Sequence, residues 1–261
     1  YADITDINGE TRSGEKTVSV SYKSLILQTS IPVRLPADSL KKLYISTRNM
    51  NGEFEPANIT VKISPLKAEN RLIRDRLWER PDQFVMSKDA YIRNFPNDEY
   101  DNEADFKSWE KNPALFTKND SSRSNGQWPV VHSGFSPGFY AVEVIAKDKK
   151  GQEVKDIQYF ELYDEKSNKL GRPDYLWTGT LQTNVEAGKT AMVELGTAAD
   201  SLFVVHQVNK DPNNRETVYK FLELSNQKEK FSFNSSEADK GGFGTNWMFV
   251  KHNRFHQLNQ T

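Results

Sequence analysis

FYAVEVIAKDKKGQEVKDIQYFELYD, residues 139–164, is the stretch that decides the fold. Apolar and polar residues alternate on both sides of Lys150-Gly151, as they do in strands that bury one face. Glycine readily adopts the positive φ of a tight turn, so the stretch predicts a long β-hairpin. The stretch resembles a looser copy of the first 22 residues, with Asp148 and Gly151 aligned to Asp6 and Gly9.

The position of the copy bears on domain organisation. In the later copy the hairpin closes a unit immediately before the polar stretch 165–174, which we interpret as a linker. Residues 1–22 therefore predict the terminal hairpin of a preceding sandwich, with Val18 and Val20 on one face. The rest of that unit would lie upstream, in a longer tandem array. A start at Tyr1 without a leader segment agrees with this expectation.

Further alternating runs occupy most of the chain, at 17–22, 42–49 and 57–66 and at six places after the linker. Glycine and asparagine punctuate them, which is typical of antiparallel sandwiches. We expect an all-β fold of tandem immunoglobulin-like sandwiches at 23–165 and 173–261. Because strand side chains alternate, Ile59, Val61 and Ile63 are predicted to face one way and to pack against Tyr140, Val142 and Val144 or their alternates.

The segment 67–134 has a different pattern and predicts a small helical insertion. RLIRDRLWER, SKDAYIRNF and DNEADFKSWEK each stand before a proline, which ends a helix, and Ser87 and Asp101 or Asn102 are suitable N-caps. We expect three short helices, followed by a polar loop at 118–127.

Composition excludes several functional classes. Lys and Arg total 35 and Asp and Glu 36, so no global charge attracts nucleic acid. The absence of cysteine excludes disulfides, thiolate metal sites and a thiol nucleophile. Mean hydropathy is −0.75, and no apolar run approaches the roughly 18 residues of a membrane-spanning helix. We therefore expect neither nucleic acid as a partner nor a direct membrane span.

Three stretches imitate catalytic or cofactor-binding motifs. GFSPG at 134–138 matches the nucleophile elbow, but Pro137 after Ser136 has no N–H for an oxyanion hole, and a strand pattern follows. AGKT at 187–190 ends like a phosphate-binding loop, but Thr183 stands where the pattern requires glycine. GGFGT at 241–245 lacks the last glycine of a dinucleotide fingerprint. We expect no enzymatic activity, no catalytic residue and no cofactor.

Metal sites are also disfavoured. His252 and His256 would be about 13 Å apart on a strand, too far for one zinc without a bend, and we interpret them as surface residues at a strand end. His132 and His206 stand alone and are expected to pack or form hydrogen bonds. An acidic cluster is a candidate calcium site, but it lacks the glycine and the distal glutamate of an EF-hand. The cluster consists of Asp98, Glu99, Asp101, Glu103 and Asp105.

Basic and aromatic residues in the insertion permit two readings. Four arginines near Trp78 form a small basic patch, which we interpret as a salt-bridged helical face. The arginines are Arg71, Arg74, Arg76 and Arg80. Trp78, Trp109 and Trp128, if exposed, could stack on a ligand. A surface module that binds glycan or another protein is therefore the alternative function.

The phrases NMNGEFEPANITVKISPL (49–66) and GGFGTNWMFVKHNRF (241–255) resemble bacterial alpha-2-macroglobulin family proteins. There, N-x-x-G-x-x-x-x-A-N-x-T-V-K is matched at Asn49–Lys62. The paired glycines, aromatic strand and V-K-x-N-R-F ending are matched at Gly241–Phe255. The resemblance covers most of the chain except the insertion, and its motifs are structural.

The resemblance implies a scaffold made of macroglobulin-like domains within a large bacterial envelope protein that traps proteases. Its partners would be the target proteases, through the parent protein, and the neighbouring domains. The parent would be periplasmic or anchored as a lipoprotein. The family can capture a protease with a Cys-x-Glu-Gln thioester; this chain has no cysteine, so it carries no thioester, and no bait segment is identified.

Overall fold

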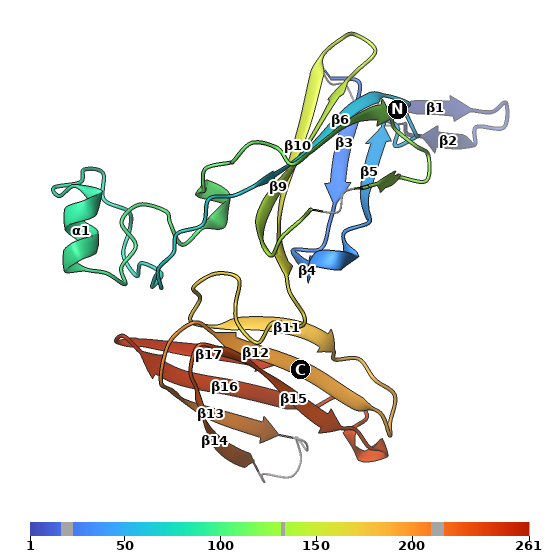
Figure 1. The fold of residues 1–261 in the computed structure, drawn as a ribbon. Helices are drawn as coiled ribbons and strands as arrows, with labels where there is room; N and C mark the ends of the chain where they lie inside the picture. The colour runs from blue at the N-terminus through green and yellow to red at the C-terminus, as the bar shows by residue number, and fades with distance from the viewer. Residues whose placement is uncertain (17–22, 132–133, 210–216, 261) are drawn as a thin grey trace.

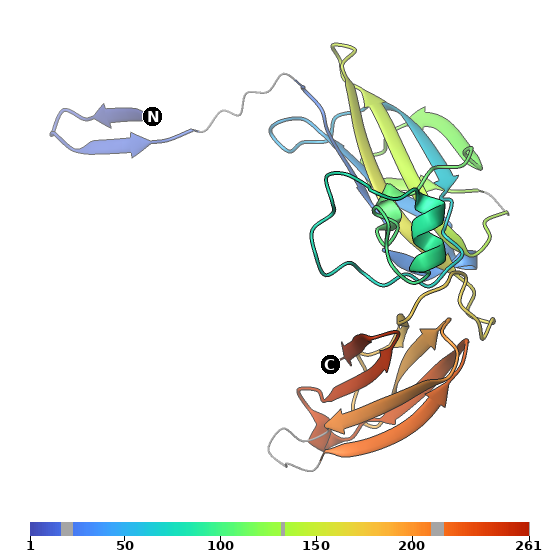
Figure 2. The ribbon, with the colours of Figure 1, turned by 90° about the vertical axis from the view of Figure 1, so that its left-hand side faces the viewer.

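A computed structural model describes residues 1–16, 23–131, 134–209 and 217–260 (Figure 1). Strands dominate and are arranged as two β-sandwiches, one after the other along the chain, with a separate hairpin before them. The prediction of an all-β fold of tandem sandwiches is confirmed. Figure 2 shows the hairpin apart from the first sandwich, and Figure 1 shows the helical insertion to one side of that sandwich.

The first sandwich has a sheet of three strands and a sheet of five. The first sheet has the order β3-β5-β8, and its strands are β3 (Ile26–Ser30), β5 (Lys42–Arg48) and β8 (Gln127–Pro129). The second has the order β4-β10-β9-β6-β7, and its strands are β4 (Arg34–Pro36), β6 (Asn58–Pro65), β7 (Phe116–Ser121), β9 (Gly138–Lys147) and β10 (Glu153–Tyr163). This alternation between sheets is the Greek-key order of an immunoglobulin-like sandwich.

The core of the first sandwich follows the sequence pattern. Ile59, Val61 and Ile63 are at most 1% exposed, while Asn58 and Lys62, at alternate positions of the same strand, face solvent. Strand β6 pairs with β9, so Val61 lies beside Val144 in one sheet. The predicted facing of these residues is confirmed: the apolar set shares one buried face.

The hairpin of β9 and β10 turns at Gly151, whose φ of 78° is open to glycine without strain. Asp148 fixes this turn by accepting hydrogen bonds from the amides of Lys150 and Gln152, both at 2.8 Å. A third segment also uses this carboxylate, because Ser24 Oγ donates to it at 2.9 Å. The turn therefore anchors the chain where it enters the first sandwich.

The insertion is shorter and less helical than predicted. It lies between β6 and β7, because residues 116–121 and 127–129 form strands of the sandwich rather than a polar loop. Its regular elements are α1 (Lys88–Asn94), capped by Ser87 Oγ, and the 3-10 turn η2 (Phe106–Ser108). The helix predicted at 71–80 is absent. That stretch is extended instead, and its arginine side chains bind the backbone of residues 96–101.

The second sandwich has seven strands. Three form the sheet β11-β12-β15, and these are β11 (Trp177–Gln182), β12 (Thr190–Thr197) and β15 (Gln227–Asn234). Four form the sheet β14-β13-β16-β17, and these are β14 (Val218–Leu224), β13 (Leu202–Asn209), β16 (Gly244–Lys251) and β17 (Arg254–Gln260). The first, second and fifth strands oppose the other four, again the immunoglobulin-like order. Trp247, fully buried, is at the centre of the core.

The N-terminal hairpin is a two-stranded sheet of β1 (Ala2–Thr5) and β2 (Thr11–Gly14). It turns at Asn8-Gly9, where Asp6 accepts the amides of Asn8 and Glu10 at 2.9 Å, just as Asp148 does in the later hairpin. All its residues are exposed. Val18 and Val20 lie outside the described residues, and membership of a preceding sandwich stays a prediction.

Candidate functional site: the junction between the sandwiches

The stretches that imitate catalytic motifs form turns before strands. Ser136 precedes β9 and no helix follows it; its carbonyl accepts the hydroxyl of Tyr140 at 2.7 Å. Gly188, within AGKT, lies in a turn with φ of 82°, and β12 follows. Gly241 and Gly242 form a similar turn before β16. None of the three stretches precedes a helix N-terminus that could hold an oxyanion or a phosphate.

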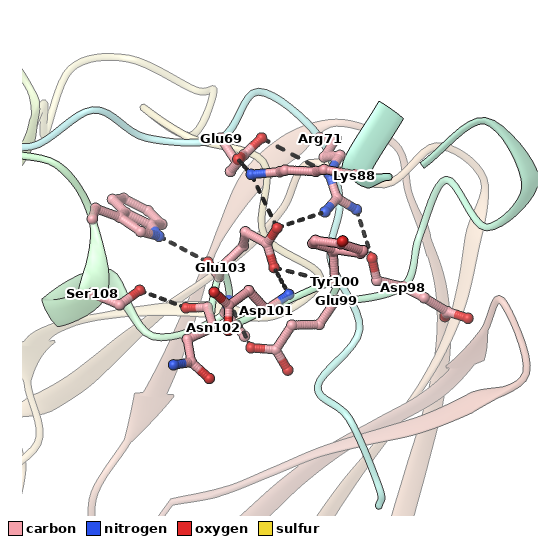
Figure 3. A network of polar contacts seen from close by, with 12 residues as sticks. Glu69, Arg71, Lys88, Asp98, Glu99, Tyr100, Asp101, Asn102, Glu103 and Ser108 are labelled. Atoms are coloured by element: carbon pink, nitrogen blue, oxygen red, sulfur yellow. Dashed lines mark hydrogen bonds and ion pairs between the residues drawn. The ribbon is translucent and has the colours of Figure 1, made fainter. Parts of the chain in front are cut away.

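The acidic cluster of the insertion is occupied by internal partners (Figure 3). Glu103 is 6% exposed; it accepts the amides of Tyr100 and Asp101 at 3.0 and 2.7 Å and pairs with Lys88 at 3.0 Å. Burial alone would raise the pKa of Glu103, but these hydrogen bonds and the charge of Lys88 outweigh it, and the pKa lies below its usual range. Among the described residues, no group of acidic or histidine side chains could hold a metal ion.

The predicted basic patch is indeed salt-bridged, but on an extended segment. Arg71 donates to the carbonyl of Asp98 at 2.8 Å, and Arg76 to that of Tyr100 at 3.0 Å. Arg80 pairs with the carboxylate of Asp101. A guanidinium has five donors, so it can satisfy several carbonyls of an irregular loop at once. The arginine side chains thus supply hydrogen bonds to the loop carbonyls in place of the backbone hydrogen bonds of a helix.

Arg74 joins the insertion to the second sandwich. Its Nε donates to Asp98 Oδ1 at 2.6 Å, and its Nη1 donates to the carbonyl of His252, in the turn between β16 and β17. Leu72, from the same segment, packs against the core of the second sandwich. One extended segment of the first domain therefore contacts both domains.

The two histidines of the last hairpin meet at Tyr175 rather than at a metal. The Tyr175 hydroxyl shares a 2.7 Å hydrogen bond with His252 Nδ1, and its ring stacks on that of His256 at a centroid distance of 4.7 Å. Tyr175 is 3% exposed, and burial raises its pKa to about 12. Burial also lowers the pKa of both histidines. The interpretation of the pair as surface residues is wrong for His256, which is half-buried.

His206 packs in the second core, as expected. Its ring stacks on Trp247 at 4.7 Å, and its Nε2 shares a 2.7 Å hydrogen bond with Thr245 Oγ1. Burial lowers its pKa to about 4, so the imidazole is neutral at neutral pH. His132 lies outside the described residues.

A second junction surrounds Trp177, the first residue of β11. Its indole Nε1 donates to Glu161 Oε1, near the end of β10, at 3.0 Å. Arg34 binds Oε2 of the same carboxylate at 2.6 Å, donates to the carbonyl of Thr178 and lies 5.0 Å from the Trp177 ring. Glu161 is 6% exposed, and its charge is compensated by these donors. One carboxylate of the first sandwich thus orients the first strand of the second.

The space for Trp177 depends on two glycines. A Cβ at Gly179 would lie 2.7 Å from the indole, and one at Gly196 would lie 3.1 Å from it and 2.7 Å from Leu170. The ammonium of Lys228 lies 5.3 Å from the ring centroid and donates to the carbonyl of Asp164 at 2.7 Å. A cavity of about 150 Å³ remains beside these groups. This site is not predicted from the sequence. The signal that could have revealed it is a glycine placed two residues after the tryptophan that follows the linker.

Glu194 is the other buried carboxylate of this junction. It is 2% exposed and lies 4.0 Å from the ammonium of Lys228. Burial raises its pKa, and the lysine opposes the shift only in part.

The three tryptophans proposed for ligand stacking differ in exposure. Trp109 and Trp128 are 9% and 1% exposed and belong to core clusters, whereas Trp78 is 56% exposed. Arg172, in the linker, lies over Trp109 and Phe139 at 5.3 and 4.5 Å, which ties the linker to the first sandwich. An aromatic stacking platform in the insertion is therefore wrong for two of its three members.

The sequence matches no known protein family and no curated protein. Weak structural similarity extends to solved proteins that include two adhesins and an alpha-2-macroglobulin. A tetra-tandem repeat from the extending region of a large adhesion protein is 11% identical, with a TM-score of 0.30, over 99% of this chain and 54% of that one. A 1.5-MDa bacterial ice-binding adhesin is 12% identical, with a TM-score of 0.27, over 93% and 64%. Native alpha-2-macroglobulin from E. coli is 12% identical, with a TM-score of 0.37, over 97% and 17%.

The chain thus spans less than two thirds of each of these three structures. Likeness at this level assigns no function. Within the described ranges, every helix is too short or too polar to cross a bilayer.

Proposed function

We propose that this chain is a non-catalytic scaffold, in which two sandwiches are held at a defined orientation. The carrying observation is the double attachment between them: Trp177 on Glu161 at one point, and Arg74 on the turn at His252 at another. Two separated contacts restrict hinge and twist together, whereas a linker alone would leave relative motion as the default. A scaffold held in this way sets the distance between the domains on either side of it.

The parent protein, in this proposal, is an alpha-2-macroglobulin-like protein of the bacterial envelope that traps proteases. The sequence phrases support it: Asn49–Lys62 covers the loop before β6 and much of that strand, and Gly241–Phe255 covers the turn, β16 and the start of β17. Target proteases and adjacent macroglobulin-like domains are the partners. The chain itself would perform no chemical step, in keeping with the placement of Ser136 and Gly188 in turns before strands.

A distance measurement tests the scaffold. The chain has no cysteine, so a variant with Lys150→Cys and Lys230→Cys accepts two spin labels selectively, one on each sandwich. We expect a single narrow distance distribution that broadens when Trp177→Ala is added. A distribution already broad in the unmodified background would contradict the scaffold.

A separate assay tests the trap. The parent protein, incubated with a broad-specificity protease, should retain the protease in a complex that still cleaves a small peptide but no longer cleaves a large protein substrate. Free protease with undiminished activity on the large substrate would reject protease trapping, and it would leave the scaffold intact.

A further inference from the structure

The outer face of the four-stranded sheet in the second sandwich carries an ordered set of side chains. Directly paired residues on neighbouring strands point to the same face. Tyr219, Gln207, Asn246 and Asn259 are paired in this way across β14, β13, β16 and β17. Their sequence neighbours, such as Trp247, point into the core. We call these four residues the amide row.

The amide row has polar groups free for a ligand. Within the described part of the chain, the side-chain amides of Gln207 and Asn246 and the hydroxyl of Tyr219 make no hydrogen bond, and Asn259 bonds only Gln257, at 3.1 Å. The Asn246 Oδ1 is buried, so this side chain offers a ligand its Nδ2 donors, whereas Gln207 offers both donors and an acceptor. Strands lie about 4.8 Å apart, so the row presents these groups over roughly 14 Å.

Two parallel rows beside it are mainly apolar. Phe221, Val205 and Met248 form the next row, which ends in Gln257 on β17, and Phe203, Val250 and Phe255 belong to the one after. Phe203 and Phe221 are 59% and 65% exposed, and their rings are nearly parallel, with an interplanar angle of 14°. Exposed apolar area of this extent on a sheet face marks a binding surface.

The charge on this face is nearly zero. Across the three rows, Glu223, at the edge of the third, is the charged residue. A phosphate backbone, an anionic membrane or an acidic peptide would find no cation in the amide row to pair with. The edge strand β14 also carries Lys220 and Glu223, and such charges discourage addition of another strand.

We propose that this face binds an uncharged oligosaccharide. Sugar rings present apolar C–H faces, which fit the exposed rings of Phe221 and Tyr219, and equatorial hydroxyls, which both donate and accept and so match primary amides. A flat sheet suits an extended chain of sugars lying along the amide row. The site is independent of the scaffold function, because the contacts at Trp177 and Arg74 involve none of these residues.

Affinity electrophoresis of the whole chain tests the proposal. Native gels are cast with one of six soluble neutral polysaccharides: dextran, amylopectin, galactomannan, xyloglucan, mixed-linkage β-glucan or yeast mannan. Heparin and alginate serve as charged comparisons. We expect retardation by at least one neutral polymer and none by the charged ones. Migration unchanged in all six neutral gels, or retardation confined to heparin or alginate, would overturn the proposal.

Matched variants assign the site. Tyr219→Ala removes one aromatic contact and should weaken binding by roughly tenfold. Asn246→Ala should also weaken binding. Tyr44→Ala and Gln152→Ala remove an exposed aromatic ring and an exposed amide from the first sandwich and should leave binding unchanged. Equal effects of Tyr219→Ala and Tyr44→Ala would reject this face as the site. So would sedimentation showing that the chain dimerises and that Phe221→Ala abolishes the dimer, because a second copy would then cover the face.

Discussion

The indole Nε1 of Trp177 donates a 3.0 Å hydrogen bond to Oε1 of Glu161, and this contact joins the first strand of one sandwich to the last strand of the other. Trp177 is 2% exposed, and the cationic side chains of Arg34 and Lys228 lie over its ring. The residue therefore combines a packed ring with a satisfied polar group.

Trp177→Ala should lower the free energy of unfolding by about 3–5 kcal/mol, because the indole leaves a cavity and Glu161 loses a donor. Urea titration followed by tryptophan fluorescence measures it. Trp78→Ala is the matched control: its side chain is 56% exposed, so the same substitution should cost under about 1 kcal/mol. Equal losses for the two variants would show that the indole does not hold the junction.

The facing of β6 gives a second prediction. Val61→Asp places a carboxylate among Val144 and other buried residues and should cost about 4 kcal/mol or more, whereas Thr60→Asp on the other face should cost much less. Thermal melting of the two variants side by side provides the measurement. Similar drops in melting temperature would contradict the facing.

The sequence predicts a strand when its side chains alternate between core and solvent, but not when only its backbone hydrogen bonds place it in the sheet. Alternation in β6 and β9 is a direct consequence of burial on one face, so these strands could be predicted together with their core residues. The strand β7 could not, because its exposed polar side chains conceal a backbone that pairs fully with β6.

The prediction of a helix at 71–80 in the insertion was wrong for a different reason. RLIRDRLWER has helical spacing, yet Arg71, Arg74 and Arg76 form tertiary contacts with loop carbonyls that a local pattern does not encode. The junction at Trp177 is likewise a product of packing between distant segments. Tertiary contacts override weak local propensity in such places.

His206 predicts a dependence of stability on pH. Its folded pKa of about 4 lies below the 6.5 of an exposed histidine, so the unfolded chain binds the extra proton between these values. Its contribution is fully present above pH 6.5 and is lost as pH falls toward 4, about 3 kcal/mol in all. His206→Gln should flatten the fall in stability between pH 6.5 and 4.5, measured by urea titration at each pH. An unchanged slope would mean that His252 and His256, whose pKa values are also lowered, account for it.

The N-terminal hairpin should contribute nothing to the stability of the sandwiches. An isolated two-stranded hairpin is marginal in water, and every residue of β1 and β2 is exposed. Deletion of residues 1–16 should leave the melting temperature unchanged within about 1 °C. Amide exchange at Thr11–Gly14 should be much faster than at 59–63 in the intact chain. A clear loss of stability on deletion would show that the hairpin docks on a sandwich.

Arg74 supports the last prediction, which concerns the attachment of the insertion. Its guanidinium binds Asp98 within the insertion and the carbonyl of His252 in the second sandwich, so one side chain bridges two domains. Arg74→Ala should therefore speed amide exchange in the turn at 251–254 while exchange at Val61 stays as it was. Arg74→Lys keeps the charge but has no planar fork for both partners, so it should give most of the same effect. Arg80→Ala is the control, because the pair of Arg80 with Asp101 is half exposed and lies within the insertion. If Arg74→Ala and Arg80→Ala change exchange at 251–254 equally, the bridge to His252 does not restrain the second sandwich.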